Sequence, residues 1–212
     1  MSETTLCKLC GKRRARRHCP AVHGDICTIC CGTEREVSLS CPLECEFLQE
    51  AHRREKPIPV NEKEVSEPDI RVTEEFIRDH EELLLFCMVS LVHAALRTDS
   101  ATDADALEAL EALIKTYRTA EAGLLYETRP VNAIAATLQR ALADSIADYQ
   151  KVRAERESLS FRNAEILGVL VFLRRMGQQN QNGRPRGRMY LDLLRQMTPA
   201  TAGDERAPGI IV

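Results

Sequence analysis

Cysteine and histidine side chains near the beginning of the chain have the spacing of metal ligands. Eight of the nine cysteines lie between Cys7 and Cys45. Seven of these eight occur as C-x2-C, a single cysteine separated by three residues from a histidine, a second C-x2-C and a C-x3-C, and the eighth, Cys31, directly follows Cys30. Ligand pairs two or three residues apart can point two donor atoms from one turn at a single tetrahedral ion. The candidate ligands are Cys7, Cys10, Cys19, His23, Cys27, Cys30, Cys41 and Cys45.

Eight ligands would fill two closed tetrahedral sites, which is typical of structural zinc. We therefore expect two Zn2+ ions per chain. Spacing alone does not say which pairs share an ion, and two alternative ligands remain open: Cys31 in place of Cys30, and His18 in place of His23. Disulfides are disfavoured because the first residues are polar and do not form a secretory signal, which predicts a reducing, cytoplasmic location.

The ligand pattern resembles that of the cross-brace zinc fingers, most closely the B-box, and is similar to HIT-type and MYND fingers. HIT fingers also have a proline after the third cysteine, as in Cys19-Pro20. A B-box instead has histidines at the positions of Cys41 and Cys45. The resemblance covers the ligands of about forty residues and implies a protein-interaction module. It also implies one zinc held by Cys7, Cys10, Cys27 and Cys30, and another held by Cys19, His23, Cys41 and Cys45.

The segment 41–55 is predicted to form a helix with Pro42 at its first position. Cys41 and Cys45 would then stand one turn apart and face the same way. Gly11, directly after Cys10, permits the tight turn that a C-x2-C pair needs. Turns followed by a helix are the arrangement of a treble-clef finger, so we expect a small two-zinc, treble-clef-like module over residues 1–56.

A basic loop lies between the first two groups of cysteines and has two interpretations. As a phosphate-binding loop it would give salt-dependent affinity for nucleic acid. Alternatively, its charge offsets the thiolates, since a zinc ion with four thiolates carries a net charge of −2. The cations of this loop are Lys12, Arg13, Arg14, Arg16 and Arg17.

The rest of the chain is predicted to be helical, which makes the protein mainly α. Prolines and the absence of periodic apolar residues mark 57–68 as a linker. Residues 69–197 should form an all-α bundle of four to five helices, followed by a disordered tail over 198–212. The expected helices, with Thr73 as an N-cap and Gly177 as a stop, are 73–97, 103–126, 130–157, 164–176 and 188–197.

Few other residues in the helical part suggest chemistry. His80, Cys87 and His93 share a helix face only loosely and are expected to be core or surface residues. A second basic cluster contains Arg184, Arg186 and Arg188, with Arg174 and Arg175 near it. Residue patterns for a nucleophile and its base, or for a phosphate-cradling glycine loop, do not rise above chance.

Composition excludes some functions. The chain has a formal net charge of −3, 4% aromatic residues and no tryptophan, which argues against stacking of single-stranded bases. Its longest apolar run is far shorter than the ~20 residues of a membrane span. We expect a non-enzymatic zinc protein whose finger and helices mediate protein–protein interaction or self-association. Nucleic-acid binding through residues 12–17 is the alternative, and an enzyme with an unrecognised site in the helical domain is the third possibility.

Overall fold

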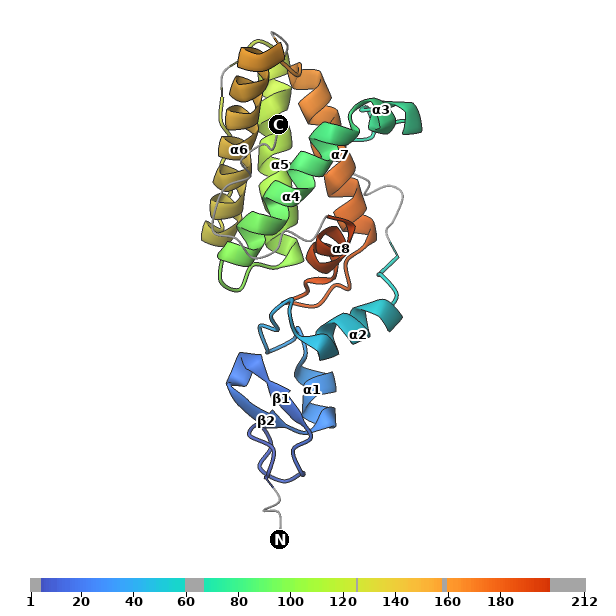
Figure 1. Cartoon of the computed structure of the whole chain (residues 1–212), viewed down its shortest axis with the longest axis vertical. Helices are drawn as coiled ribbons and strands as arrows, with labels where there is room; N and C mark the ends of the chain where they lie inside the picture. The colour runs from blue at the N-terminus through green and yellow to red at the C-terminus, as the bar shows by residue number, and fades with distance from the viewer. Residues whose placement is uncertain (1–4, 60–66, 125, 158–159, 199–212) are drawn as a thin grey trace.

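The computed structural model describes residues 5–59, 67–124, 126–157 and 160–198. Figure 1 shows an elongated molecule with a small finger at one end and a helical bundle at the other. The described part contains eight α-helices and one short two-stranded sheet. The predicted class, a small finger followed by a mainly α domain, is therefore confirmed.

The finger is built from a turn, a hairpin and two helices. Its elements are β1 (Arg17–Cys19), the 3-10 helix η1 (Pro20–Val22), β2 (Gly24–Ile26), α1 (Thr28–Glu34) and α2 (Glu46–Arg54). The strands pair antiparallel, with Arg17 opposite Ile26. Gly11 has a φ of +63°, which lets the chain turn sharply after Cys10 so that Leu6 pairs with Arg14.

The prediction that a helix begins at Pro42 is wrong. α2 begins at Glu46, and Cys45 is its N-cap residue. The residues between Cys41 and Cys45 instead form a turn closed by a 3.0 Å hydrogen bond from the Cys45 N–H to the Pro42 carbonyl. Cys41 therefore lies outside the helix, and the two thiols do not stand one helical turn apart on a common face.

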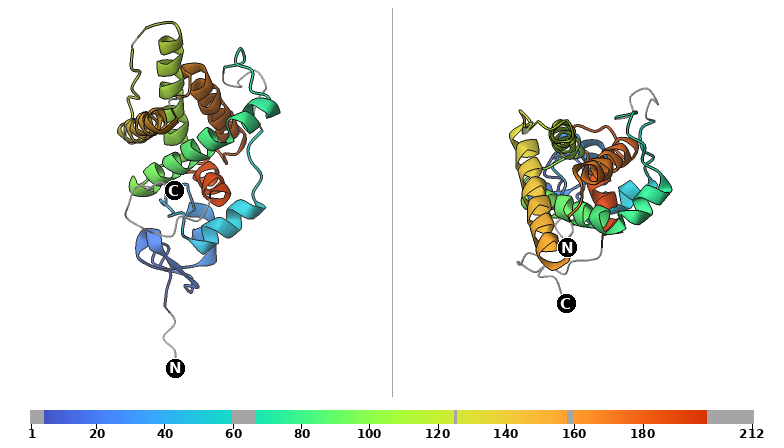
Figure 2. Two further views of the ribbon diagram at one scale, coloured as in Figure 1. Left: turned by 45° about the horizontal axis from the view of Figure 1, so that its top comes forward. Right: turned by 90° about the horizontal axis from the view of Figure 1, so that it is seen from above.

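The bundle surrounds α5. Its helices are α3 (Glu74–Asp79), α4 (Glu81–Arg97), α5 (Asp103–Glu121), α6 (Ala133–Glu157), α7 (Asn163–Gln179) and α8 (Met189–Met197). Both views in Figure 2 show α5 between α6 and α7, while α4 crosses α6, α7 and α8. Apolar side chains from these helices form one continuous core, which includes Leu113, Leu142, Leu170 and Leu191.

The predicted helix 73–97 is two helices, because the chain breaks at His80. Thr73 caps α3 as predicted, by accepting a 3.1 Å hydrogen bond from the Phe76 N–H. The His80 backbone leaves helical geometry at φ −118° and ψ 24°. Its ring stacks on Phe76 and its Nδ1 lies 2.8 Å from the Phe76 carbonyl oxygen, which stabilises the break.

Two other predicted helices are shorter in the structure than the sequence predicted. The second helix ends at Glu121 rather than at residue 126, close to Gly123, whose φ of +78° suits a chain reversal. The third begins at Ala133 rather than at Pro130, because the Asn132 side chain accepts hydrogen bonds from the next backbone N–H groups. The tail predicted over 198–212 lies outside the described residues apart from Thr198. Most of the linker, residues 60–66, also lies outside them.

Gly177 does not stop α7, which continues to Gln179. A Cβ at this glycine would lie 2.8 Å from the ring of Tyr190 and 2.7 Å from Leu107. The Tyr190 ring is fully buried, and its hydroxyl donates a 2.8 Å hydrogen bond to the Leu173 carbonyl, so it cannot move aside easily. Glycine is therefore required here by close helix packing rather than by the end of a helix.

We expect Gly177→Ala to destabilise the bundle by about 1–3 kcal/mol, because the added methyl overpacks a full core. Gly32→Ala is the matched control, since Gly32 also lies in a helix and its Cβ would meet nothing within 4 Å. Chemical denaturation followed by circular dichroism measures both variants. Equal stability of the two would contradict this role for Gly177.

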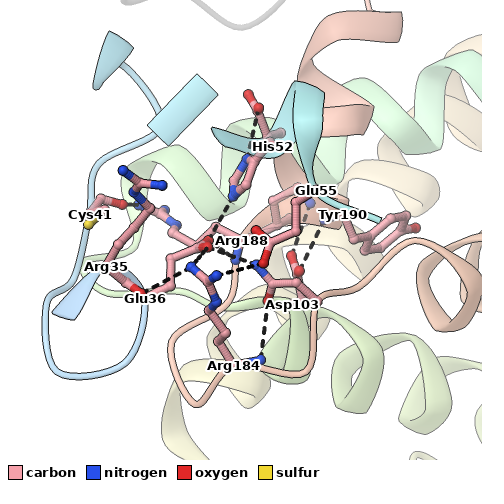
Figure 3. A network of polar contacts seen from close by, with 12 residues as sticks. Arg35, Glu36, Cys41, His52, Glu55, Asp103, Arg184, Arg188 and Tyr190 are labelled. Atoms are coloured by element: carbon pink, nitrogen blue, oxygen red, sulfur yellow. Dashed lines mark hydrogen bonds and ion pairs between the residues drawn. The ribbon is translucent and has the colours of Figure 1, made fainter. Parts of the chain in front are cut away.

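A buried polar network joins the finger to the bundle (Figure 3). Glu36 follows α1 in a left-handed conformation, at φ +54°, and is fully buried. His52 from α2 contacts two carboxylates: its Nε2 lies 3.0 Å from Glu36 and its Nδ1 lies 3.0 Å from Asp192 of α8. Charges placed in an interior are stable only when paired and hydrogen-bonded, so this arrangement fixes α2 against α8.

The second basic cluster belongs to this junction. Figure 3 shows Arg184 and Arg188 directed at finger residues. The Arg184 Nη2 lies 2.6 Å from Glu55, and the Arg188 Nη1 donates a 3.1 Å hydrogen bond to the Cys41 carbonyl. The guanidinium of Arg186 contacts the hydroxyl of Ser40. A phosphate-binding role for this cluster is therefore not favoured, because its cations already hold the finger.

The remaining members are also engaged within the fold. The Arg174 Nη2 lies 2.7 Å from a carboxylate oxygen of Glu111, and the Arg175 guanidinium donates to the carbonyl oxygens of Glu67 and Ile70. Both arginines thus stabilise the packing of α7 against neighbouring segments.

The contacts of His52 change its charge behaviour. Burial by itself lowers the pKa of His52, but its hydrogen bonds to Asp192 and Glu36 outweigh burial and raise the pKa to about 9. Burial acts to raise the pKa values of Glu36 and Asp192, yet hydrogen bonding to His52 lowers both. The imidazolium and the two carboxylates are therefore the stable charge states near neutral pH.

Because the pKa of His52 is higher in the folded chain than its ordinary value of 6.5, its contribution to stability is complete below that value and is lost as pH rises through about 9. We expect His52→Gln to cost up to about 3–5 kcal/mol near pH 6, since Glu36 and Asp192 lose the buried cation that bridges them. The two carboxylates keep Arg184 and Arg195 as cationic neighbours, which limits the cost. The difference from wild type should shrink toward about pH 10. Denaturation of both proteins across this range tests the prediction.

The control is His18→Gln, because the exposed His18 pairs with Asp25 on the surface. This change should alter stability by less than about 1 kcal/mol. Parallel pH profiles for wild type and His52→Gln would show that His52 is not charged in the folded chain.

Candidate metal centre

Four of the predicted ligands meet in one group. The Sγ atoms of Cys7, Cys10, Cys27 and Cys30 all lie within 4.8 Å of one another. The first pair comes from the turn that Gly11 closes, and the second pair comes from the start of α1, where Cys27 is the N-cap. Tetrahedral coordination at 2.3 Å places sulfurs about 3.8 Å apart, so the group has the dimensions of a metal site.

Backbone N–H groups surround these sulfurs. Burial by itself raises the pKa of Cys7, but hydrogen bonds from backbone N–H groups, beginning with that of Cys10, lower it to about 6. The N–H groups of Lys12 and Arg13 lower the pKa of Cys10. Cys30 behaves oppositely: a hydrogen bond with Cys27, together with burial, raises its pKa to about 12. Cys7 and Cys10 therefore ionise more easily than Cys30, and a divalent cation bound by the group would displace the proton of Cys30.

Arg13 of the basic loop faces this group. Its side chain hydrogen-bonds to Cys27, which raises the pKa of the guanidinium, and the charges of Cys10 and Cys30 add to the effect. One of the five loop cations therefore offsets sulfur charge, as one of the two interpretations of the loop predicted.

Arg17 also faces sulfur, but at a different cysteine. Its Nη1 donates to the Sγ of Cys31 at 3.4 Å, and its guanidinium lies 4.4 Å over the ring of Phe47. Arg35 donates to the same Sγ at 3.6 Å. Cys31 is thus engaged by two guanidinium groups, while its neighbour Cys30 contributes to the four-sulfur group.

The second predicted ligand set is less compact. Cys19 and Cys41 are buried, Cys45 is half-buried, and His23 is exposed with its backbone in the left-handed region at φ +48°. Burial raises the pKa of Cys41 to about 11, and the charges of Cys45 and Cys19 contribute. These thiols are therefore electrostatic neighbours. Within the described ranges, however, no three of the second set approach one another as the first four do, so the second site stays a prediction.

The other candidate ligands have other partners. The exposed ring of His18 lies 3.2 Å from Asp25 on the paired strand. Cys87 is fully buried in the bundle, and burial raises its pKa to about 12. Among the residues that the structure describes, the side chains that could together hold a metal ion do not include His80, Cys87 or His93.

Lys12, Arg14 and Arg16 remain on the surface of the finger. Arg14, Arg16 and Arg17 line a shallow concavity of about 260 Å³ together with Thr5, Ala15, His18 and Asp25. The basic loop therefore divides its cations between the sulfurs and the solvent.

Comparison with known proteins gives no relative: no family model, curated protein or solved structure matches the chain. Among the described helices, none is both long and apolar enough to cross a membrane. The four-sulfur group is consequently the feature on which a functional assignment depends.

Sequence reasoning missed the network around His52. The only local signal was a histidine on the face of an amphipathic helix, and its partners Glu36 and Asp192 lie 16 and 140 residues away. Pairings this distant become visible only when the elements are packed together.

We expect Cys10→Ser to abolish metal binding at the four-sulfur group, because an incomplete tetrahedral set binds weakly. Titration of the reduced, metal-free full-length chain with Co2+ would show this as a loss of thiolate-to-cobalt absorption equivalent to one site. Cys87→Ala is the control, since it removes a buried thiol of the bundle and should leave the absorption unchanged. Full Co2+ absorption in Cys10→Ser would contradict the assignment.

Proposed function

We propose that this chain is a non-enzymatic zinc-binding protein whose finger and helical domain mediate protein–protein interaction or self-association. The observation that carries the proposal is the closed set of four thiols in a finger fixed to the bundle. Four thiolates complete a tetrahedral zinc site, so the ion has no open position for a reacting water. A metal in such a place stabilises a surface rather than performing chemistry.

The proposed finger is of the cross-brace type, similar to B-box, HIT-type and MYND fingers, and holds two Zn2+ ions. The second ion would use Cys19, Cys41 and Cys45, with His23 as the fourth ligand. Support comes from the burial of Cys19 and Cys41 and from the electrostatic effect of the neighbouring thiols on Cys41. A protein that keeps so many thiols available for metal belongs in a reducing compartment such as the cytoplasm.

Nucleic-acid binding is the second candidate. It is favoured by the exposed cations Lys12, Arg14 and Arg16 and by the basic concavity beside them. Against it, Arg13 and Arg17 are directed at sulfur, which leaves fewer charges for phosphate than the sequence suggests. The affinity expected from three free cations is modest and strongly dependent on salt.

Native mass spectrometry of the full-length chain tests the metal content, and we expect two zinc ions. Cys10→Ser and Cys19→Ser should each lose one ion, because they belong to different sites. A single zinc ion in the wild-type chain would contradict the cross-brace type of finger, but would still agree with a zinc finger that has one site. A metal-free chain with an ordered finger would refute the proposed function.

Binding of a single-stranded RNA, titrated with salt, separates the two candidates. If affinity is high and falls by orders of magnitude when salt rises, the nucleic-acid function gains support. Neutralising Arg14 and Arg16 should then abolish RNA binding, whereas neutralising Glu46 and Glu50 on α2 should leave RNA binding unchanged. Negligible RNA binding at low salt favours protein interaction.

A further inference from the structure

Three large apolar side chains of the finger are exposed beside cysteines of the four-sulfur group. Leu6, Leu9 and Ile29 are 55%, 40% and 52% exposed, respectively. Leu9 immediately precedes Cys10, and Ile29 immediately precedes Cys30. Since these two cysteines belong to one group of sulfurs, both side chains flank the same centre. We call Leu6, Leu9 and Ile29 the apolar tip.

Cations border the apolar tip. Leu6 is the bridge partner of Arg14, so the two lie side by side on neighbouring backbone segments. Lys12 follows the Gly11 turn only two residues after Cys10 and is exposed. Asp25, the acidic residue of the hairpin, is paired with His18. The border of the tip is therefore positively charged, and its centre is apolar.

The dark-blue segment at the start of the described chain, which carries Leu6 and Leu9, lies at the end of the finger away from the bundle, and α1, which carries Ile29, lies beside the hairpin (Figure 1). The opposite side of the finger is occupied by the contacts of Glu36, His52 and Arg188 with the bundle. The tip is consequently held in a fixed position and is accessible to another molecule.

From this arrangement we infer that the apolar tip binds an acidic protein segment that carries aliphatic side chains. This inference rests on the proposed function and specifies its partner. Aliphatic groups of the segment would cover Leu6, Leu9 and Ile29, while its carboxylates would meet Lys12 and Arg14. Apolar contact supplies the affinity, and opposite charge supplies selectivity and rate of association.

Nucleic acid fits this surface less well than such a segment. Phosphate groups would use the two cations but would leave three aliphatic side chains in water. Base stacking needs aromatic faces, and the nearest aromatic residue of the finger, Phe47, lies under the guanidinium of Arg17. The combination of an aliphatic centre and a basic border is complementary to a peptide that is both apolar and acidic.

Fluorescence anisotropy with the zinc-loaded full-length chain tests this inference. The probe is a labelled short peptide of alternating glutamate and leucine pairs. Two counterparts replace glutamate with lysine or leucine with serine. We expect the first peptide to bind and each counterpart to bind at least tenfold more weakly. The double variant Leu9→Ser with Ile29→Ser should weaken binding of the first peptide roughly tenfold or more.

The matched control is Leu96→Ser, because Leu96 is 43% exposed on α4 and does not belong to the finger. It should bind the peptide as wild type does. Lys12→Glu with Arg14→Glu should also weaken binding at least tenfold, and added salt should lower wild-type affinity. Zinc content and circular dichroism verify that each variant is folded.

Three results would overturn the inference: no binding of the acidic peptide, equal binding by the Leu9→Ser/Ile29→Ser and Leu96→Ser variants, or a preference for the lysine peptide. If RNA binds and the Leu9→Ser/Ile29→Ser variant binds it as well as wild type does, the cations at the border of the apolar tip bind phosphate instead. If the acidic peptide does not bind while a protein partner cross-links to another face of the zinc-loaded chain, the inference about the apolar tip is wrong and the proposed function is still supported. Failure of the function itself is recognised separately, by a metal-free ordered finger.

Discussion

Negative charge on closely spaced sulfurs is the constraint that shapes the finger. Four sulfur atoms within 4.8 Å of one another cannot all ionise unless positive charge is placed among them. The chain provides part of it through backbone N–H groups at Cys7 and Cys10 and through the guanidinium of Arg13. A divalent ion would supply the rest, and its binding energy would then also be folding energy for a module with a small apolar core.

The same constraint explains why the finger surface is less basic than the sequence of the loop suggests. An extended segment points alternate side chains in opposite directions. Arg13 and Arg17 are four residues apart and both face sulfur, while Lys12, Arg14 and Arg16 lie between or beside them and face solvent. The charge count of the sequence therefore overstates what is available to a partner. The second group sets much of the electrostatic character of the finger surface, and Arg17 adds to it at the wall of the concavity.

The sequence predicted features that depend on local spacing. Paired cysteines identified the members of the four-sulfur group, and helical periodicity identified the bundle, because both signals lie within a few residues of one another. Which cysteine pairs belong together was implied by the resemblance to cross-brace fingers and not by the spacing. Predictions failed where a distant contact decided the outcome. Gly177 resembled a helix stop, yet the ring of Tyr190 and the side chain of Leu107 require it inside α7. Arg184 and Arg188 resembled a free basic cluster, yet Glu55 and the Cys41 carbonyl engage them. The break at His80 is a different case, because it involves a local contact: the His80 ring lies against the Phe76 carbonyl four residues earlier, and apolar periodicity does not reveal such a bond.

The junction adds a second requirement, which links Cys41, a ligand of the second predicted zinc site, to the orientation of the finger. The Cys41 carbonyl accepts a hydrogen bond from Arg188, and the Cys41 sulfur accepts one from the backbone N–H of Glu36. The carboxylate of the same Glu36 contacts His52. A displacement of Cys41 would therefore disturb both the thiol and the buried carboxylate. Because an unpaired buried charge is costly, the finger has few alternative positions relative to α8. A surface held this firmly loses little conformational entropy when a partner binds, which makes even a small apolar tip effective.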